Sequence, residues 1–323
     1  MDRHASVEAG SGSAQAGSTL AHGQPKLLVI DGHCYAYRAF FAIRSLSSPT
    51  GAATNAIYGF IRMLMKIQAQ IQPTHVIVVW DGGLAQERMT LLPGYKAQRA
   101  EMPSDLEAQL DHIVDYLRGA NIASYMKNGC EADDCIAAIT ERAVAAGWDV
   151  VIGTSDKDFM QLVSPRVTLL NPHDKTGTLV GVEQVRAKTG VEPTQIVDWL
   201  SMIGDSVDNI PGVPGVGPKT AADLLHQFGS VNALYARLGE VRSERVRGSL
   251  EKSAEVLRRN QRLVQLHVEA GCEVPLEDLA VRPVDGERLR ELFSVWGFKR
   301  LSQELEEARM KAADLFVEHA GAA

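Results

Sequence analysis

The sequence predicts an α/β protein with a parallel sheet, and three short apolar runs are the main reason. Residues 26–31, 75–81 and 149–153 are continuous stretches rich in valine, isoleucine and leucine. Runs of this length are typical of strands that helices cover on both faces. Helical segments lie between them, so strands and helices alternate over roughly residues 25–175, which is the order found in α/β domains.

Apolar spacing and capping signals indicate the helices. Residues 54–71 carry isoleucine, leucine and phenylalanine at helical spacing. A helix over residues 104–119 is expected to open with a capping box between Ser104 and Glu107. A third helix is expected over residues 131–146, where Gly147 supplies the stop signal.

The composition limits the class of protein. The 323 residues are 45% apolar and 23% charged, with a net charge of −7. These values exclude collagen-like, coiled-coil and wholly disordered chains. The four cysteines have no C-x-x-C spacing, which argues against a zinc ribbon or a disulfide scaffold and favours a reducing cytosol. No apolar run approaches 18 residues, so no membrane span is expected.

Three aspartates are expected at or just beyond the C-terminal ends of the predicted strands: Asp31, Asp81 and Asp156. In open parallel sheets, ligands bind at that edge. A single aspartate after a strand is usually a turn or helix cap. Three in one chain are harder to explain in that way.

Further carboxylates suggest a metal site. Asp133 and two closely spaced pairs, Asp156 with Asp158 and Asp205 with Asp208, add to the set. Glu131 and Asp134 share a helix face, although the helix dipole alone could favour acids there. The nine candidates are Asp31, Asp81, Glu131, Asp133, Asp134, Asp156, Asp158, Asp205 and Asp208.

If these groups converge, their pKa values rise unless positive charge compensates them. All-oxygen ligation selects Mg²⁺ or Mn²⁺ over zinc, and two such ions can clamp a phosphodiester. A phosphatase with an aspartate nucleophile would need a second aspartate at position 33, where the chain has His33.

A glycine-rich hairpin follows the last acidic pair. Gly215 and Gly217 permit a tight turn, and Pro218 suits the first turn of a helix. Amides at such a helix start bind phosphate oxygens, to which Lys219 and Thr220 add a charge and a hydroxyl. A nucleotide P-loop is disfavoured because Pro218 separates Gly217 from Lys219. A plain interhelical turn is the alternative.

Taken together, these stretches resemble the bacterial 5′-nucleases, the flap endonuclease/5′-3′ exonuclease group that also forms the N-terminal domain of many DNA polymerases I. The resemblance covers about residues 26–300 and includes residues 94–99, Gly-Tyr-Lys-Ala-Gln-Arg. It implies a PIN-like core that carries a helical arch and a helix-hairpin-helix region. It also implies Mg²⁺-dependent cleavage of branched DNA near junctions between single strand and duplex, and all nine acidic family positions are filled.

The resemblance also implies roles for individual residues. Lys96 and Arg99 are placed at the base of the arch near the scissile phosphate, and Arg38 is another expected phosphate contact. Tyr37 and Tyr95 are candidates for stacking on unpaired bases, with a place in the core as the alternative. The DNA backbone is expected to contact Gly215, Gly217, Lys219 and Thr220, with K⁺ as a further candidate ligand of that hairpin.

The expected organisation has four parts. Residues 1–24 form a disordered tail, and residues 25–180 form the PIN-like core with the arch around 84–103. Residues 181–305 form the helical DNA-binding region, and residues 306–323 form a C-terminal tail. Within the helical region, residues 237–262 carry a local charge of +4 that either tracks duplex phosphates or is a solvated helix face.

The leading hypothesis is a monomeric, stand-alone structure-specific 5′-nuclease of DNA replication and repair. It would act in the cytoplasm at the nucleoid, on flapped or branched DNA including RNA-containing 5′ strands. An excised polymerase domain is the alternative to the stand-alone form. A PIN-type ribonuclease and a non-catalytic DNA-junction binding module are the competing functions. The hairpin counts against the first, and the complete acidic set counts against the second.

Overall fold

The computed structural model describes residues 24–174 and 176–320, so the tail expected over residues 1–24 lies, except for Gln24, outside the described residues. The described residues form a six-stranded sheet with the order β3-β2-β1-β4-β5-β6. The first five strands are parallel, and β6 pairs antiparallel with β5. The strands are β1 (Lys26–Asp31), β2 (His75–Trp80), β3 (Ala123–Met126), β4 (Asp149–Gly153), β5 (Val167–Leu170) and β6 (Leu179–Val180).

Helices cover both faces of the sheet, as the apolar strand runs predict. Along β1, Leu28 and Ile30 point to one apolar core, whereas Leu27 and Val29 point to another. The first core lies under α1 (Gly32–Ala42), α2 (Asn55–Ile71) and α4 (Ser104–Gly119). The second lies under α5 (Ala132–Ala145) and continues into the helices that follow the sheet.

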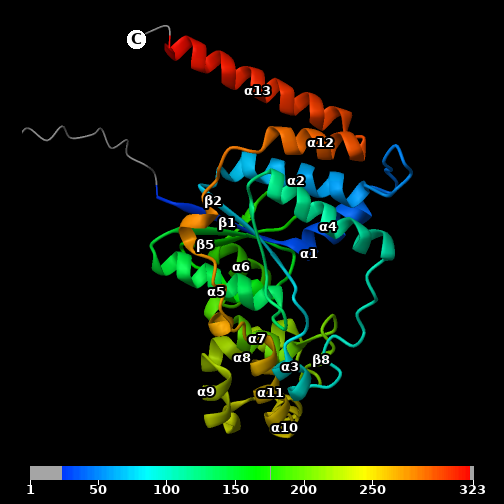
Figure 1. The fold of residues 1–323 in the computed structure, drawn as a ribbon. Helices are drawn as coiled ribbons and strands as arrows, with labels where there is room; N and C mark the ends of the chain where they lie inside the picture. Colours follow the sequence, from blue (N-terminus) through cyan, green and yellow to red (C-terminus); the bar gives the residue numbers. More distant parts are fainter. Residues whose placement is uncertain (1–23, 175, 321–323) are drawn as a thin grey trace, which may run out of the picture.

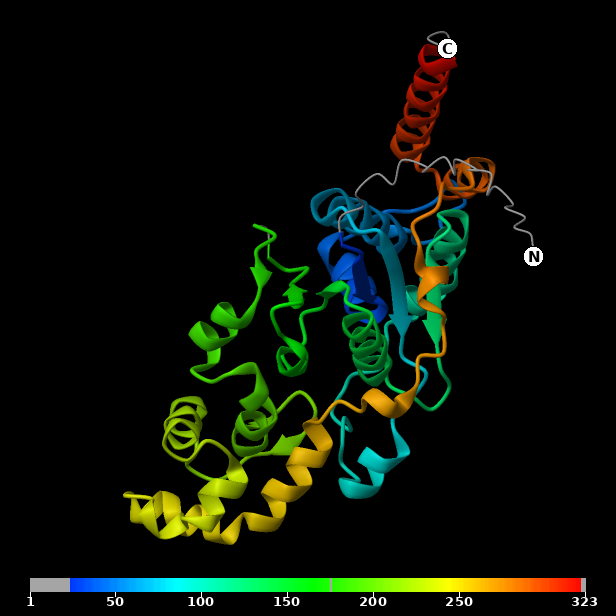
Figure 2. The same cartoon turned by 90° about the vertical axis from the view of Figure 1, so that its left-hand side faces the viewer.

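A second group of helices lies beyond one end of the sheet, at the bottom of Figures 1 and 2. It contains a short two-stranded ribbon, β7 (Gly204–Asp205) with β8 (Ile210–Pro211). Its helices are α3 (Gln86–Leu91), α7 (Ile196–Ile203), α8 (Pro218–Phe228), α9 (Val231–Ala236), α10 (Glu244–Lys252) and α11 (Ala254–Val264). The helix α6 (Val182–Thr189) lies between the sheet and this group. Short 3₁₀ turns are η1 (Asp158–Leu162), η2 (Pro193–Gln195), η3 (Leu238–Glu240), η4 (Val268–Ala270) and η5 (Leu276–Leu279).

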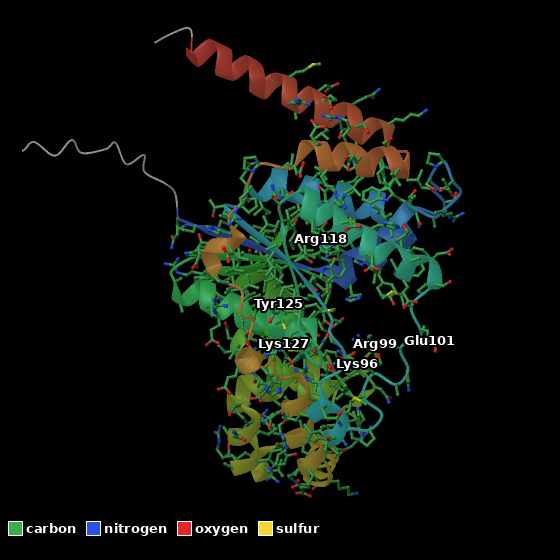
Figure 3. The ribbon with its side chains drawn as sticks, viewed as in Figure 1. Lys96, Arg99, Glu101, Arg118, Tyr125 and Lys127 are labelled. Atoms are coloured by element: carbon green, nitrogen blue, oxygen red, sulfur yellow. The ribbon has the colours of Figure 1, made fainter. Side chains whose placement is uncertain are left out.

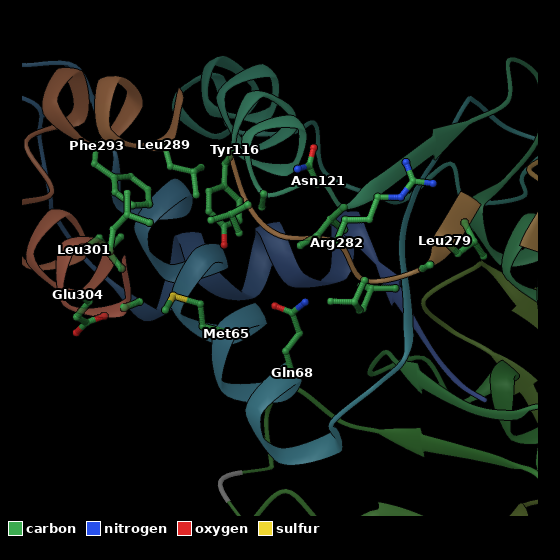
Figure 4. Close-up of a pocket in the computed structure, with 18 residues that line it drawn as sticks. Met65, Gln68, Tyr116, Asn121, Leu279, Arg282, Leu289, Phe293, Leu301 and Glu304 are labelled. Carbon is green, nitrogen blue, oxygen red and sulfur yellow. The ribbon is translucent and has the colours of Figure 1, made fainter. Parts of the chain in front are cut away.

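The sequence predicts one helical region over residues 181–305. In the structure the chain leaves the helical group after α11 and returns to the sheet. Figure 2 shows this orange segment running back along the sheet to α12 (Gly286–Trp296). Leu289, Phe293 and Leu301 belong to the core beneath α2 and α4. An apolar pocket of about 270 Å³ lies where these elements meet α13 (Figure 4).

The helix α13 corrects the expected C-terminal tail. It covers Lys299–Ala320, so the chain is helical over most of the segment 306–323. Residues 299–320 contain no glycine or proline and are rich in alanine, glutamate and leucine, which have high helix propensity. That signal was present in the sequence.

Most of the remaining secondary-structure predictions are confirmed, and one is wrong. The strands β1, β2 and β4 and the helices α2 and α5 are confirmed. The capping box at the start of α4 is wrong, because Pro103 is the N-cap residue and no side chain caps it. The Pro103 carbonyl instead accepts hydrogen bonds from the amides of Leu106 and Glu107. None of the helices in the described part of the chain is long and apolar enough to cross a membrane.

Gly82 joins two loops at the carboxyl edge of the sheet, and we predict that it tolerates no side chain. Its amide donates to the Cys130 carbonyl, and a Cβ atom there would lie 1.8 Å from the Lys127 carbonyl oxygen. The substitution Gly82→Ala should therefore lower the free energy of unfolding by roughly 1–3 kcal/mol. Urea unfolding checks this, with Gly239→Ala as the control because open space surrounds Gly239. Equal stability of the two variants would contradict the prediction.

Candidate active site

Six carboxylates converge on one cleft, and three of them, Asp31, Asp81 and Asp156, are the ones that the predicted strand ends bring together. The cleft has a volume of about 890 Å³ and lies at the carboxyl edge of the sheet, where the helical group begins. Its carboxylates come from the ends of β1 and β2, from α5, from the loop after β4, and from β7 and the turn that follows it. They are Asp31, Asp81, Asp133, Asp156, Asp205 and Asp208.

Asp31 lies at the floor of the cleft. Its Oδ1 atom accepts a hydrogen bond from the Cys34 amide (3.0 Å), and its Oδ2 atom accepts one from the Thr154 hydroxyl (3.0 Å). Burial raises the pKa of Asp31 to about 7, and the negative charges of Asp81 and Asp156 contribute in the same direction. Asp81 itself is oriented by the Ala132 amide, 2.8 Å from its Oδ1 atom.

Asp133 and Asp156 are the acids of the cleft centre. Burial and then the charge of Asp156 raise the pKa of Asp133 well above its usual value. The nearest cation is Lys96, whose Nζ atom lies 3.9 Å from the Asp133 carboxylate. Burial also raises the pKa of Asp156, whose Oδ1 atom accepts a hydrogen bond from the Asp158 amide (2.9 Å).

A second group of carboxylates has the spacing of a cation site. Oxygen atoms of Asp158, Asp205 and Asp208 all lie within 4.8 Å of one another. The Oδ1 atom of Asp158 is buried and has no hydrogen-bond partner among the described residues. Burial, followed by the charge of Asp156, raises the pKa of Asp158 well above its usual value. An orphaned buried carboxylate oxygen is costly and favours a cation beside it.

Glu131 is close to the cleft but already saturated with donors. Its Oε2 atom accepts hydrogen bonds from Lys96 Nζ (2.7 Å), Arg88 Nη1 (3.1 Å) and the Tyr95 hydroxyl (3.1 Å). Its Oε1 atom accepts one from the Ala85 amide (3.2 Å). The side chain is 1% exposed, so Glu131 holds the start of the predicted arch in place.

The sequence predicts Asp134 as a metal ligand, but the structure places its carboxylate outside the cleft. Both of its oxygens accept hydrogen bonds from the Arg88 guanidinium at 2.8 Å, and the His267 amide donates to the same carboxylate (2.9 Å). Its carboxylate does not line the cleft. Neighbouring helix positions point about 100° apart, so Asp133 faces the cleft and Asp134 faces away from it.

Arg88 is the residue that the sequence analysis missed. It is 2% exposed, and its guanidinium also donates to the carbonyls of Leu263 (3.1 Å) and Gln265 (3.0 Å). It therefore joins α3, the start of α5 and the end of α11. Nothing in the local pattern around position 88 distinguishes it from an exposed arginine, because its partners are far away in the sequence.

Lys96 and Arg99 reach the cleft from the segment between α3 and α4 (Figure 3). The Arg99 guanidinium lies 2.7 Å from Asp208 Oδ1, and the Lys96 amide donates to the Asp208 carbonyl (3.0 Å). Lys96 has a φ angle of 54°, a left-handed conformation that is rare for a lysine. Backbone strain of this kind is typical of functional sites.

The two tyrosines differ in position. Tyr95 is 5% exposed and donates its hydroxyl proton to Glu131, so its ring belongs to the core and is not available to stack on a base. Its predicted DNA contact is therefore wrong. Tyr37 lines the cleft and stacks on Phe41, with ring centroids 6.3 Å apart. Its role as a base-stacking platform stays a prediction.

The hairpin lies between α7 and α8. Gly215 has a φ angle of 79°, which requires glycine, whereas Gly217 is extended and directly precedes Pro218 at the start of α8. Lys219 and Thr220 lie in the first turn of that helix. Their contacts with a DNA backbone stay predictions.

Family models match most of the chain. Residues 26–190 match the 5′-3′ exonuclease, N-terminal resolvase-like domain, and residues 191–287 match the 5′-3′ exonuclease, C-terminal SAM fold. This chain belongs to the 5′-3′ exonuclease family. The resemblance in the sequence is therefore confirmed.

Relatives of this family include both short and long proteins. A 5′-3′ exonuclease of Aquifex aeolicus is 36% identical, over 89% of this chain and 97% of its own length. DNA polymerase I of Bacillus caldotenax is 37% identical, over 87% of this chain and 32% of its own length. The chain therefore spans about a third of that polymerase.

Solved structures of two nucleases share the fold. A T5 5′-exonuclease with bound zinc ions has a TM-score of 0.63 at 21% identity, over 84% of this chain and 99% of the other. The catalytic core of Rad2 in complex with a DNA substrate has a TM-score of 0.59 at 17% identity, over 87% and 91%. These matches confirm the predicted α/β core with its helical additions.

The buried Arg88–Asp134 pair is expected to contribute to the stability of the fold. Arg88→Ala leaves the buried Asp134 carboxylate without its cation and should lower the free energy of unfolding by about 3–5 kcal/mol. Asp134→Ala should cost less, because Arg88 keeps its ion pair with Glu131. The double variant should lose less than the sum of the two, because it leaves no unpaired group at these positions. Urea unfolding of all three variants measures the coupling. Strict additivity would contradict the pairing.

The raised pKa values predict how metal stabilisation depends on pH. Asp31 keeps its proton to about pH 7 in the folded protein but loses it near pH 4 in the unfolded chain, so without metal its contribution to stability falls as pH rises from 4 through 7. Protons also compete with cations for Asp31, Asp133 and Asp158. The increase in Tm caused by Mn²⁺ should therefore be larger at pH 8 than at pH 6.

Thermal unfolding at both pH values checks this prediction. Asp133→Asn should lose most of the increase, whereas Asp111→Asn, on the exposed side of α4, should keep it. An equal increase at the two pH values would show that protons and the metal do not compete for these carboxylates.

Proposed function

We propose that this chain is a structure-specific 5′-nuclease that hydrolyses DNA phosphodiesters near junctions between single strand and duplex. One observation carries the proposal: six carboxylates and two arch cations, Lys96 and Arg99, face the same cleft. Six clustered acids are suited to bind divalent metal ions. The side chains of Lys96 and Arg99 are suited to bind the phosphate that those metal ions would activate. Membership of the 5′-3′ exonuclease family supports the same reaction.

The residues fit divalent metal ions. All the ligand atoms offered are oxygens, which suit Mg²⁺ and Mn²⁺. Asp158, Asp205 and Asp208 would hold one ion, and Asp31, Asp81, Asp133 and Asp156 would contribute to another. Bound in this way, divalent ions polarise a phosphodiester and lower the pKa of water. The T5 5′-exonuclease of the same fold was solved with divalent ions, which supports the assignment.

The protein side chains supply position and charge. Glu131 and Asp208 hold Lys96 and Arg99 in place before substrate arrives, through contacts of 2.7 Å. Ordered cations lose little freedom when a phosphate binds, so they stabilise the added charge of the transition state. Arg38 also lines the cleft and is proposed as a further phosphate contact.

Several finer features belong to the proposal. The substrate is flapped or branched DNA, with RNA-containing 5′ strands accepted, and the hairpin with Gly215 and Gly217 binds the DNA backbone and K⁺. The Rad2 core of similar fold was solved with DNA substrate. We also propose that the chain acts as a monomer at the nucleoid in replication and repair, with or without an attached polymerase.

Two other functions are weaker. A PIN-type ribonuclease does not require the hairpin between α7 and α8. A junction-binding module without catalysis does not require an orphaned carboxylate oxygen on Asp158 beside two further acids.

Product mapping on a 5′ flap and a matched single strand tests the proposal, with Mg²⁺ and with EDTA. We expect Mg²⁺-dependent incision at the flap junction. Asp133→Ala and Asp156→Ala should abolish incision, by 10³-fold or more (order of magnitude,), and keep flap binding, whereas Asp111→Ala should cut normally. Tight binding without incision by the unaltered protein would favour the binding module. Full incision by both cleft variants would refute the metal site.

A further inference from the structure

The cleft contains cations that the acidic cluster does not use. Among the described residues, five lysine and arginine side chains line it. Three of them pair with carboxylates: Lys96 with Glu131 (2.7 Å), Arg99 with Asp208 (2.7 Å) and Lys157 with Asp205 (3.2 Å). The other two, Arg38 and Lys188, have no ion pair or hydrogen bond to any residue in the described ranges.

These two cations and a histidine reach the cleft from three separate elements. Arg38 lies on α1, Lys188 lies in the last turn of α6, and His173 lies in the loop between β5 and β6. All three residues line the same cleft, and burial followed by the positive charge of Arg38 lowers the pKa of His173. A histidine ring can donate a hydrogen bond to an anion in either protonation state.

Their lack of partners indicates what they bind. A cation that served only to neutralise the acids would contact one of the six carboxylates, as Lys96, Arg99 and Lys157 do. Arg38 and Lys188 face the cleft within reach of its contents but outside the 4 Å limit of every described carboxylate. Water can solvate these cations until an anion enters the cleft with the substrate, and the anions of a nucleic acid are its phosphates.

We propose that Arg38, His173 and Lys188 form a second phosphate subsite, which binds one backbone phosphate of the cleaved strand next to the scissile phosphate. The proposal rests on the nuclease function for its substrate, and it adds His173 and Lys188 to the substrate contacts. Two anchored phosphates fix the direction and the register of the strand, whereas one anchored phosphate fixes only a point. The subsite therefore determines which phosphodiester lies over the acidic floor.

Removal of one charged contact should have a measurable effect on flap cleavage. A hydrogen bond to a charged group contributes enough that its loss lowers kcat/KM roughly tenfold. We expect this loss for Lys188→Ala and a smaller one for His173→Ala. Lys299→Ala removes the same charge at the exposed start of α13 and should leave kcat/KM unchanged. Lys188 is exposed on α6, so its variant should keep the Tm of the unaltered protein.

A substrate scan identifies the phosphate. Flaps are prepared with a single neutral methylphosphonate at each position on both sides of the scissile bond, and kcat/KM is measured for the unaltered protein and for Lys188→Ala. At one position the neutral linkage should slow the unaltered protein about tenfold and leave Lys188→Ala unaffected, because that variant has already lost the contact.

The outcomes separate this proposal from the proposed function. Incision of the unmodified flap with no position that couples to Lys188 would overturn the subsite and leave the nuclease intact. The same follows if Lys299→Ala loses as much activity as Lys188→Ala. If the unaltered protein cuts no flap, the nuclease function fails. The Kd for each methylphosphonate flap is then measured in place of kcat/KM. Coupling in Kd would then support the phosphate subsite, and its absence would refute it.

Discussion

Crowded negative charge is the constraint on which the rest of this structure depends. Six carboxylates share one cleft, and burial together with their mutual repulsion raises the pKa of several of them. The fold keeps them close by directing donors at single oxygens, such as the Ala132 amide at Asp81 and the Thr154 hydroxyl at Asp31. Other oxygens remain without such donors, as Asp158 Oδ1 shows, and these are the atoms that a cation needs.

The charge balance of the site has two layers. Arg88 lies behind the cleft, where it neutralises Asp134 and part of Glu131 away from water. Lys96 and Arg99 lie in front, where they line the cleft. Glu131 belongs to both layers because its Oε2 atom contacts Arg88 and Lys96 together. The position of the arch cations is thus linked to a buried arginine that does not line the cleft.

The sequence predicted those parts of the site that depend on local geometry. Asp31 and Asp81 could be placed together because parallel strands end at one edge of a sheet. Asp134 could not be separated from Asp133, since its orientation depends on Arg88, 46 positions away in the sequence. Tyr95 was ambiguous for the same reason, because its burial and its hydrogen bond to Glu131 depend on residues far away in the sequence.

The larger fold shows the same division. Strands and amphipathic helices were predictable from periodicity, as β1, β2, β4, α2 and α5 show. The return of the chain from α11 to the α2 and α4 face was not, because it depends on contacts between residues far apart in the sequence, such as Leu289 and Tyr116 in one core. The helix α13 was predictable from composition, because residues 299–320 contain no glycine or proline.

The five hydrogen bonds of Arg88 also bear on how the protein is made. Two of its acceptors, the carbonyls of Leu263 and Gln265, lie 175 and 177 positions further along the chain. A nascent chain that has just completed the sheet already contains Asp31, Asp81, Asp133 and Asp156, but it cannot satisfy the guanidinium behind them. The acidic cleft therefore reaches its final form only after α11 has left the ribosome and docked. Synthesis order thus delays the completion of the acidic cleft until α11, the last helix of the helical group, is present.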